Sequence, residues 1–434
     1  MKTVFEKSTV LMLLAALTAC GGGGGGTAVD ATVAPTPTPT ATSYLGVAAG
    51  GGHTVAIKSD GTLLAWGSNL YGQLGDGSTV TRVSATQVGV GAAAVGSAIY
   101  AGEFHSVALG ACSKTGAGCS MYTWGGNDSG QLGDGTTTGK TVPTLIKATG
   151  WLDIATGGMH TAAVKRDSTT GGTLWTWGRN DKGQLGVIDT TVRYAPTQIT
   201  TCTTNGTTTA VCGTTWSRVA AGALHTVAMQ QSGAVYSWGA NTRGQMGIGT
   251  ITAGFTSPWL VSGTKKFKSI AAGGDHTLGI LDDYTLWVWG ANYFGQLGDG
   301  TIDDKSAPVQ VIGGEGLSND WRMVSAGGGH NDAGSDMPSN GGHSLGVKTD
   351  GTLWAWGSNA YGQLGTGRTE DAIVPTKIGP AGVIFTSVSA GKLHSFAMDD
   401  VGKLWAWGYN LNGQLGNGTS GTTAKNILVP TRLN

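Results

Sequence analysis

Short stretches of alternating hydrophobic and polar residues recur from Tyr44 to the end of the chain, and glycine bounds most of them. The recurring order is a Val-Ala-Ala run, a His-Thr-x-Ala run and a run that ends in Trp-Ala-Trp-Gly. Runs this short, with a period of two and glycine between them, predict β-strands. No segment shows the period of an amphipathic helix, so the pattern predicts an all-β protein.

A ten-residue motif, Trp-Gly-x-Asn-x-x-Gly-Gln-Leu-Gly, occurs seven times, with methionine replacing leucine in one copy. Consecutive copies are 51 to 67 residues apart. A repeat of this length is typical of arrays in which each copy forms one supersecondary unit. We therefore expect one closed repeat structure rather than several domains. The motifs begin at Trp66, Trp124, Trp177, Trp238, Trp289, Trp356 and Trp407.

Each copy is predicted to supply four antiparallel strands. Asp60-Gly61 and Asp350-Gly351 lie between two apolar runs. Such pairs favour a two-residue hairpin turn in which both central residues have positive φ, and they are predicted to join the second and third strands. A fourth strand is predicted to begin at a Pro-Thr pair, because proline is tolerated where no backbone donor is needed. Seven such units predict a seven-bladed β-propeller of four-stranded blades.

The two ends of the repeat region predict how the propeller closes. The region begins in a first strand at Tyr44 and ends in a Pro-Thr strand at 429–433. We expect the N- and C-terminal strands to complete one blade together, because closure removes exposed strand edges.

These motifs resemble the repeats of the regulator of chromosome condensation family over residues 44–434. The resemblance rests on the seven ten-residue motifs, on a Gly-x-x-His element upstream of each, and on the Pro-Thr strands. The family implies a seven-bladed propeller, and its members serve as nucleotide exchange factors, enzyme inhibitors, light sensors or scaffolds. The fold alone therefore does not assign the function.

The first residues are predicted to direct export. Lys2 and Lys7 precede a short apolar stretch at 10–17, and Leu17-Thr18-Ala19-Cys20 follows. This tetrapeptide resembles the lipobox of bacterial lipoproteins, in which Cys20 would carry the lipid and become the mature N-terminus. An ordinary signal peptide is the alternative. The predicted organisation is a signal peptide at 1–19, a Gly- and Pro/Thr-rich tether at 20–43, and the propeller at 44–434.

The other four cysteines are predicted to form two disulfides in an exported chain. The simplest pairings are Cys112 with Cys119 and Cys202 with Cys212, each closing a short loop. A zinc site is the alternative, but neither pair has two-residue spacing and no histidine lies nearby. Lys+Arg and Asp+Glu both number 26, so no basic footprint indicates a nucleic-acid partner.

Histidine and tryptophan are predicted to be structural. All eight histidines lie in the Gly-x-x-His element or its split copy, and equivalent positions on a ring cannot form one catalytic cluster. The tryptophans occupy repeated packing positions. A light-sensing relative carries a tryptophan beside this histidine, whereas none of the copies here does, which disfavours photoreception.

No motif for catalysis, metal or cofactor binding is complete. Asp76, Asp134 and Asp299 follow the Gly-Gln-Leu-Gly turn, but calcium would need alternating oxygen ligands that these loops lack. The stretch 135–141 is one residue short of a phosphate-binding loop. We therefore predict no enzyme, no metal and no cofactor.

The best candidates for binding lie where the repeat is interrupted or carries exposed aromatic residues. An insertion at 331–342 splits the Gly-x-x-His element of the sixth copy, between His330 and His343. It belongs to the face of the propeller that bears the seven Gly-Gln-Leu-Gly loops, and the two cysteine loops belong to the other face. A metal site of His330, Asp332, Asp336 and His343 is the alternative to a solvated loop. The candidate binding residues are Asn331, Asp332, Asp336, Asn340, Tyr71, Tyr293, Phe294 and Tyr361.

The sequence thus predicts a monomeric, non-catalytic scaffold in the bacterial cell envelope. It would be anchored by lipid on Cys20, at the outer membrane, the periplasmic side or the cell surface, and would bind a protein or other macromolecule through one face. The first alternative is an inhibitor of a periplasmic or secreted enzyme, like the β-lactamase inhibitor among the family's bacterial members. Guanine-nucleotide exchange is the second alternative, and it conflicts with export.

Overall fold

The computed structural model describes residues 43–89, 98–112, 118–168, 171–204, 207–209, 212–213, 215–261, 263, 265–313, 316–329, 342–421 and 426–433. These residues belong to one compact unit, Thr42–Asn434. Cys20, the predicted signal peptide and the tether up to residue 42 lie outside them, as do His330 and positions 331–341 of the insertion. The described residues form strands and turns without a helix, which confirms the all-β prediction. Accordingly, no helix in these ranges is long and apolar enough to cross a membrane.

Four copies of the motif form separate four-stranded antiparallel sheets, each in the order of the chain. The first copy contains β1 (Tyr44–Ala49), β2 (His53–Lys58), β3 (Leu63–Gly67) and β4 (Arg82–Gln87). The fifth contains β18 (Phe267–Ala272), β19 (His276–Leu281), β20 (Leu286–Gly290) and β21 (Lys305–Gln310). The sixth contains β24 (Trp321–Ala326), β25 (His343–Lys348), β26 (Leu353–Gly357) and β27 (Ala372–Ile378). The seventh contains β28 (Phe385–Ala390), β29 (His394–Asp399), β30 (Leu404–Gly408) and β31 (Ile427–Arg432).

The other three copies are joined in a 13-stranded sheet. The second and third share β8, because residues 140–146 of this strand pair with β7 and residues 151–156 pair with β9. A single bridge between Gly172 and Trp216 links the third copy to the fourth. The strands of the second and third copies are β5 (Ala98–Ala101), β6 (His105–Cys112), β7 (Cys119–Gly125), β8 (Lys140–Thr156), β9 (His160–Ser168), β10 (Gly171–Gly178) and β11 (Arg193–Gln198). The fourth copy has β14 (Trp216–Ala221), β15 (His225–Gln230), β16 (Val235–Ala240) and β17 (Gly254–Leu260).

Two small hairpins lie between copies. The pair β12 (Cys202–Thr204) and β13 (Thr207–Thr209) is attached to β17 through a parallel bridge, and β22 (Ile312–Gly313) pairs with β23 (Gly316–Leu317). Both predicted disulfides are present: Cys112–Cys119 closes the connection between β6 and β7, and Cys202–Cys212 closes the connection that follows β11. They hold segments that interrupt the repeat, as the sequence predicted.

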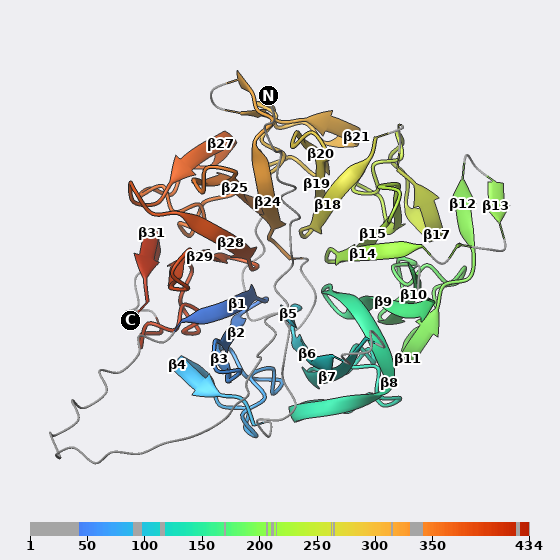
Figure 1. The fold of residues 1–434 in the computed structure, drawn as a ribbon, viewed down its shortest axis with the longest axis horizontal. Helices are drawn as coiled ribbons and strands as arrows, with labels where there is room; N and C mark the ends of the chain where they lie inside the picture. Colours follow the sequence, from blue (N-terminus) through green and yellow to red (C-terminus); the bar gives the residue numbers. More distant parts are fainter. Residues whose placement is uncertain are drawn as a thin grey trace, which may run out of the picture. The chain divides into compact units, whose positions relative to one another are not determined.

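The copies follow one another in chain order around a common centre, with β1, β5, β14, β18, β24 and β28 at the inner side (Figure 1). The prediction that both termini complete one blade is wrong: within the described ranges no sheet holds strands from both ends of the chain. The first sheet takes its four strands from β1 to β4 and the last from β28 to β31, so both end sheets are complete. They meet side by side instead, where the Ala49 amide donates to Ser389 Oγ at 2.9 Å and the Lys392 amide to the Gly50 carbonyl at 3.1 Å.

The turn between the second and third strands also differs from the prediction. Only the glycine has a positive φ, 84° at Gly61 and 81° at Gly351. The Gly61 amide donates to the Lys58 carbonyl at 2.9 Å, and Asp60 Oδ1 accepts from the Thr62 amide at 2.8 Å. The aspartate side chain thus caps a longer turn in which one left-handed residue suffices.

The hydrophobic core lies between neighbouring copies. Trp124 of the second copy, for example, packs with Val55, Ile57 and Leu63 of the first. All seven motif tryptophans are buried. Because each sheet buries its face only against its neighbours, a single copy has no core of its own.

Candidate functional site

The seven motif loops are fixed by an asparagine and a glutamine in each copy. In the first copy, Asn69 Oδ1 accepts from the Leu74 amide at 2.9 Å, and Gln73 Oε1 accepts from the Tyr71 amide at 2.9 Å. The same two bonds recur in every copy, and the asparagines and glutamines are buried. This is why the motif requires these two amides: each satisfies backbone donors that the turn would otherwise bury unpaired. We call the side of the molecule formed by these loops the loop face.

Each loop is also bonded to the next copy. The Gln73 carbonyl accepts from Trp124 Nε1 at 2.9 Å and from Ser106 Oγ at 2.8 Å. The hydroxyl bond recurs between all neighbouring copies, at 2.7–3.0 Å. The tryptophan bond recurs in six of the seven described motifs; Trp289 is the exception. The tryptophan of the motif therefore joins copies as well as filling the core.

The histidines complete a closed ring. His53 Nε2 lies 2.8 Å from Ser106 Oγ in the next copy, and the last bond returns from His394 to Thr54 of the first copy at 3.1 Å. The sequence predicted a structural role, with each imidazole bonded to a neighbouring turn; the partner is instead a strand hydroxyl of the next copy. The other five pairs are His105–Thr161, His160–Thr226, His225–Thr277, His276–Ser344 and His343–Ser395, at 2.9–3.0 Å.

The bonding fixes the tautomer of these imidazoles. Each hydroxyl has one hydrogen and gives it to the glutamine carbonyl, so it must accept from histidine, and the proton is on Nε2. Nδ1 has no hydrogen-bond partner among the described residues. Burial lowers the pKa of each of the seven imidazoles to about 3. They are neutral at physiological pH and do not titrate there.

A glycine leaves room for each imidazole. A Cβ on Gly157 would lie against Cε1 of His160, far inside van der Waals contact. The equivalent glycines of the other copies face their histidines in the same way. The Gly-x-x-His element is therefore a packing unit as much as a turn.

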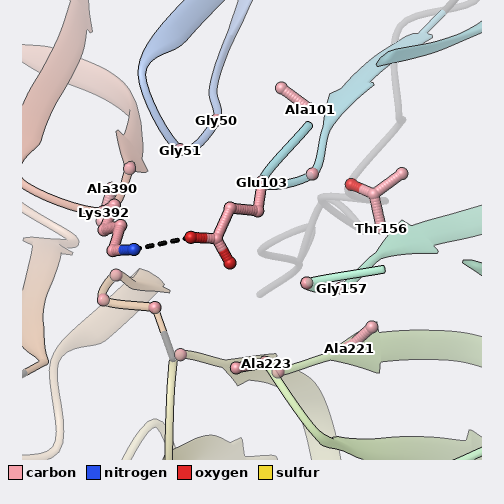
Figure 2. A pocket seen from close by; sticks show the side chains of 18 of the residues that line it. Gly50, Gly51, Ala101, Glu103, Thr156, Gly157, Ala221, Ala223, Ala390 and Lys392 are labelled. Carbon is pink, nitrogen blue, oxygen red and sulfur yellow. Dashed lines mark hydrogen bonds and ion pairs between the residues drawn. The ribbon is translucent and has the colours of Figure 1, made fainter. Parts of the chain in front are cut away.

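At the centre, these glycines and the residue before each, alanine in six copies and Thr156 in the third, line a cavity of about 170 Å³ to which all seven copies contribute (Figure 2). Among these small residues, the cavity also has one buried ion pair. Lys392 Nζ lies 2.6 Å from Glu103 Oε1, and the two side chains are 1% and 6% exposed. The pair joins the second and seventh copies across the first. It narrows the centre on the loop-face side, so the cavity is too small for a macromolecule.

The predicted aromatic residues lie on the loop face but do not gather at one point. Tyr71 packs edge-on against Phe104 at 5.1 Å, and Tyr361 packs against Tyr409 at 4.8 Å. Tyr293 is 73% exposed beside Phe294. The three sites belong to different copies, so the structure offers separate aromatic positions rather than one patch.

Sequence reasoning missed the central ion pair and the cavities beside Tyr293. Glu103 and Lys392 were visible as the only charged residues two positions before a histidine. Their pairing needed the ring closure, because 289 residues separate them. The aspartates that follow the motif stabilise turns: Asp76 accepts from the Ser78 amide at 3.0 Å and pairs with Arg82 at 2.7 Å. In the described ranges, no three His, Cys, Asp or Glu side chains gather as a metal site.

The repeat matches a known family model over most of the chain. The model described as "Regulator of chromosome condensation (RCC1) repeat" matches residues 120–164, 171–229, 232–280, 285–333, 350–398 and 401–434. A second model of the same description matches 46–73, which lies in the first copy. The chain belongs to the RCC1-repeat family. This confirms the resemblance that the motifs predicted.

Curated RCC1-repeat proteins show how widely the family varies. The ultraviolet-B receptor UVR8 of Arabidopsis thaliana is 33% identical over 86% of this chain and 79% of its own length. The human E3 ubiquitin-protein ligase HERC2 is 26% identical over 87% of this chain, which spans only 7% of that protein. One relative is named a receptor and the other a ligase, so membership alone assigns no activity.

Solved structures confirm the propeller fold. Human WBSCR16 superposes with a TM-score of 0.67, at 20% identity, over 86% of this chain and 94% of that one. Prp20p from Saccharomyces cerevisiae superposes with a TM-score of 0.64, at 20% identity, over 82% of each chain. At this identity the likeness is one of fold.

Proposed function

We propose that this protein is a non-catalytic, seven-bladed propeller scaffold, anchored by lipid outside the cytoplasm, that binds a protein or other macromolecule through its loop face. The observation that carries the proposal is the closed ring. It engages the seven described histidines and the glutamine carbonyls, so the side chains left for a partner are those that the rigid loops display. Rigid loops lower the entropy lost on binding.

Relatives support a binding role. The printed description of the Prp20p structure reports binding to Gsp1p and histones, and UVR8 is named a receptor. From these relatives we carry over to this protein only the mode of binding, in which one face of a propeller contacts a macromolecule. The balanced charge of 26 basic and 26 acidic residues argues against a nucleic-acid partner.

The working face can be tested by site-specific cross-linking in the native cell. A photo-reactive residue at Leu70, which is 59% exposed on the loop face, is expected to capture a partner. The matched control is the same residue at Asp60, an exposed position in the turn between β2 and β3 on the other face. Equal capture at both positions would contradict the choice of face.

The anchor rests on the Leu-Thr-Ala-Cys sequence at 17–20. Intact-mass analysis of the membrane fraction should find Cys20 as a lipid-modified N-terminus, and Cys20→Ala should release the protein from the membrane. A mature protein with an unmodified Cys20 would remove this part of the proposal and leave the binding role standing.

An enzyme inhibitor is the second candidate, favoured by exposed apolar side chains on the loop face. Tyr293 is 73% and Leu70 59% exposed, and buried aromatic anchors are typical of tight interfaces. Purified protein at micromolar concentration should then slow a secreted hydrolase such as a β-lactamase, and Tyr293→Ala should relieve the inhibition. Unchanged rates across such hydrolases would exclude it. Nucleotide exchange remains the weaker alternative, because a GTPase partner would be cytoplasmic.

A further inference from the structure

The loop face is hollowed where the fourth, fifth and sixth copies meet. One cavity of about 240 Å³ is lined by residues that include Arg243, Asp275, Tyr293 and Gln296. A second, of about 690 Å³, lies beside the third and fourth copies and shares Arg243 and Asp275 with the first. We call the two together the Arg243 groove. Its larger part has the volume of typical small-ligand sites.

The side-chain amide of Gln296 lines the groove and brings a hydrogen-bond donor to it. Gln296 is 3% exposed and its Oε1 accepts from the Phe294 amide at 2.9 Å, which fixes Nε2 as the other end of the amide. Nε2 has no partner among the described residues. In the third and fourth copies, the equivalent nitrogens of Gln184 and Gln245 donate to Asp181 and Asp275 at 3.3 and 3.2 Å. The Nε2 atom of Gln296 therefore keeps its hydrogens for solvent or for a bound group.

Acceptors and a second donor group lie in the same groove. Asp304 accepts from the Asn292 amide at 2.8 Å and from Arg243 at 3.3 Å, which holds its carboxylate in place. Arg243 is half-exposed and its guanidinium has further N–H groups to offer. Donors and acceptors are thus arranged side by side on fixed groups, as recognition of hydroxyls requires, since a hydroxyl both donates and accepts.

An aromatic platform borders these polar groups. Tyr293 and Phe294 lie edge to face at 5.7 Å, and Tyr293 keeps its ring largely in solvent. The apolar face of a sugar ring packs on such a platform, while its hydroxyls reach the polar groups at the ring edge. Tyrosine also orders few rotatable bonds on binding, which limits the entropic cost.

The charge of the groove indicates which ligands fit. Three carboxylates, those of Asp181, Asp275 and Asp304, line it with two cations, Lys182 and Arg243. Asp181 is further neutralised by Arg179 at 2.6 Å. This balance does not favour phosphates or other polyanions, which select clusters of arginine and lysine. A ligand rich in hydroxyls and without net charge matches it.

We infer that the Arg243 groove binds a neutral oligosaccharide of about three sugar rings. Gln296 Nε2 and Arg243 donate to its oxygens, Asp275 and Asp304 accept from its hydroxyls, and Tyr293 stacks on one ring. The inference rests on the proposed function, and it names a glycan as the macromolecule or as part of it.

The test uses the full chain on an array of neutral glycans that includes β-1,4-linked glucose, β-1,4-linked N-acetylglucosamine and α-1,4-linked glucose oligomers. At least one is expected to bind, and calorimetry in solution should confirm it. Tyr293→Ala should weaken binding about tenfold through the lost stacking. Val401→Ala is the control, since it removes a 64% exposed apolar side chain from the turn between β29 and β30 on the other face, and it should leave binding unchanged.

A second variant tests the Gln296 donor. Gln296→Glu keeps an oxygen for the Phe294 amide but removes the Nε2 donor, so it should abolish glycan binding while thermal unfolding confirms that the protein is folded. If Gln296→Glu fails to fold, Tyr293→Ala still decides the matter. No binding to any glycan of the array, or equal loss with Val401→Ala, overturns the inference. If a peptide selected from a library binds instead and depends on Tyr293, the glycan is wrong and the proposed function survives.

Discussion

Thr54 Oγ1 lies 3.1 Å from Nε2 of His394, although 340 residues separate them in the chain. The same hydroxyl donates to the Gln414 carbonyl at 2.9 Å. The first and seventh copies are therefore joined by the same bonds as all the other neighbouring copies. No special closing strand is needed. The ring is complete because the last interface repeats the internal ones.

Removing one ring hydroxyl should destabilise the protein. In Thr161→Val, the His105 Nε2 proton loses its acceptor and the Gln131 carbonyl loses one donor, and both groups are buried. We expect a loss of about 2 kcal/mol in the free energy of unfolding, measured with denaturant. Thr137→Val, at an exposed loop position, is the control and should change little. Equal stability of the two variants would mean that the ring contributes nothing.

The buried histidines should make stability fall in acid. Their folded pKa of about 3 lies below the unfolded value of 6.5, so the unfolded chain binds more protons between these values. Their contribution is complete above pH 6.5 and is lost as the pH falls toward 3. Burial raises the pKa of Asp153 to about 6, which acts in the opposite direction, but through a single group. The midpoint of thermal unfolding should therefore decrease steadily below about pH 6.5.

Nuclear magnetic resonance can check the cause of this acid dependence. Long-range nitrogen–proton spectra of the folded protein should show seven neutral imidazoles protonated at Nε2, unchanged on lowering the pH to about 5. The eighth histidine, His330, is not one of these seven, and its signal is assigned by its substitution. Titration of any of the seven ring imidazoles near the ordinary pKa of histidine would contradict both the tautomer and the origin of the pH effect.

Replacing only one partner of the central ion pair should destabilise the protein. Lys392→Met leaves the Glu103 carboxylate buried without its lysine, and we expect a loss of about 3 kcal/mol in the free energy of unfolding. Adding Glu103→Gln should recover most of this loss. The exposed pair Arg368–Glu370, at 4.0 Å, is the control, and its double-mutant cycle should give no measurable coupling. Additive effects of Lys392→Met and Glu103→Gln would refute the pairing.

The glycine that packs against each ring histidine should not tolerate a side chain. Gly157→Ala places a methyl group against the His160 ring, and the expected loss is about 2 kcal/mol or more in the free energy of unfolding. Gly46→Ala is the matched control, because its Cβ would meet only Ile57 at an ordinary 3.6 Å. A chain that accepts both substitutions equally would show that the imidazole can move aside.

The sequence was sufficient for elements whose cause is local. The motif asparagine and glutamine and the cysteine pairs each act within their own copy or loop, so their spacing predicted their place. The fourth strands were predicted in the right part of each copy, but not to begin at proline: β11, β27 and β31 each begin three residues before it. The prediction of a blade shared by both ends was wrong, because the last strand, β31, pairs with β30 of its own copy. Local patterns do not show which copy a terminal strand joins. Gln296 was missed since its environment is set by loops of three copies, which no single repeat displays.

The bond from each motif loop to the next copy has a consequence for the evolution of this chain. In an open solenoid, a repeat can be duplicated or lost because only the ends change. Here His394 and Gln414 must meet Thr54, so one copy more or fewer would alter the angle at every interface and break the circuit. The geometry of the ring therefore fixes the number of copies. The loops and the segments inserted between strands are the places where the chain can change without breaking the ring.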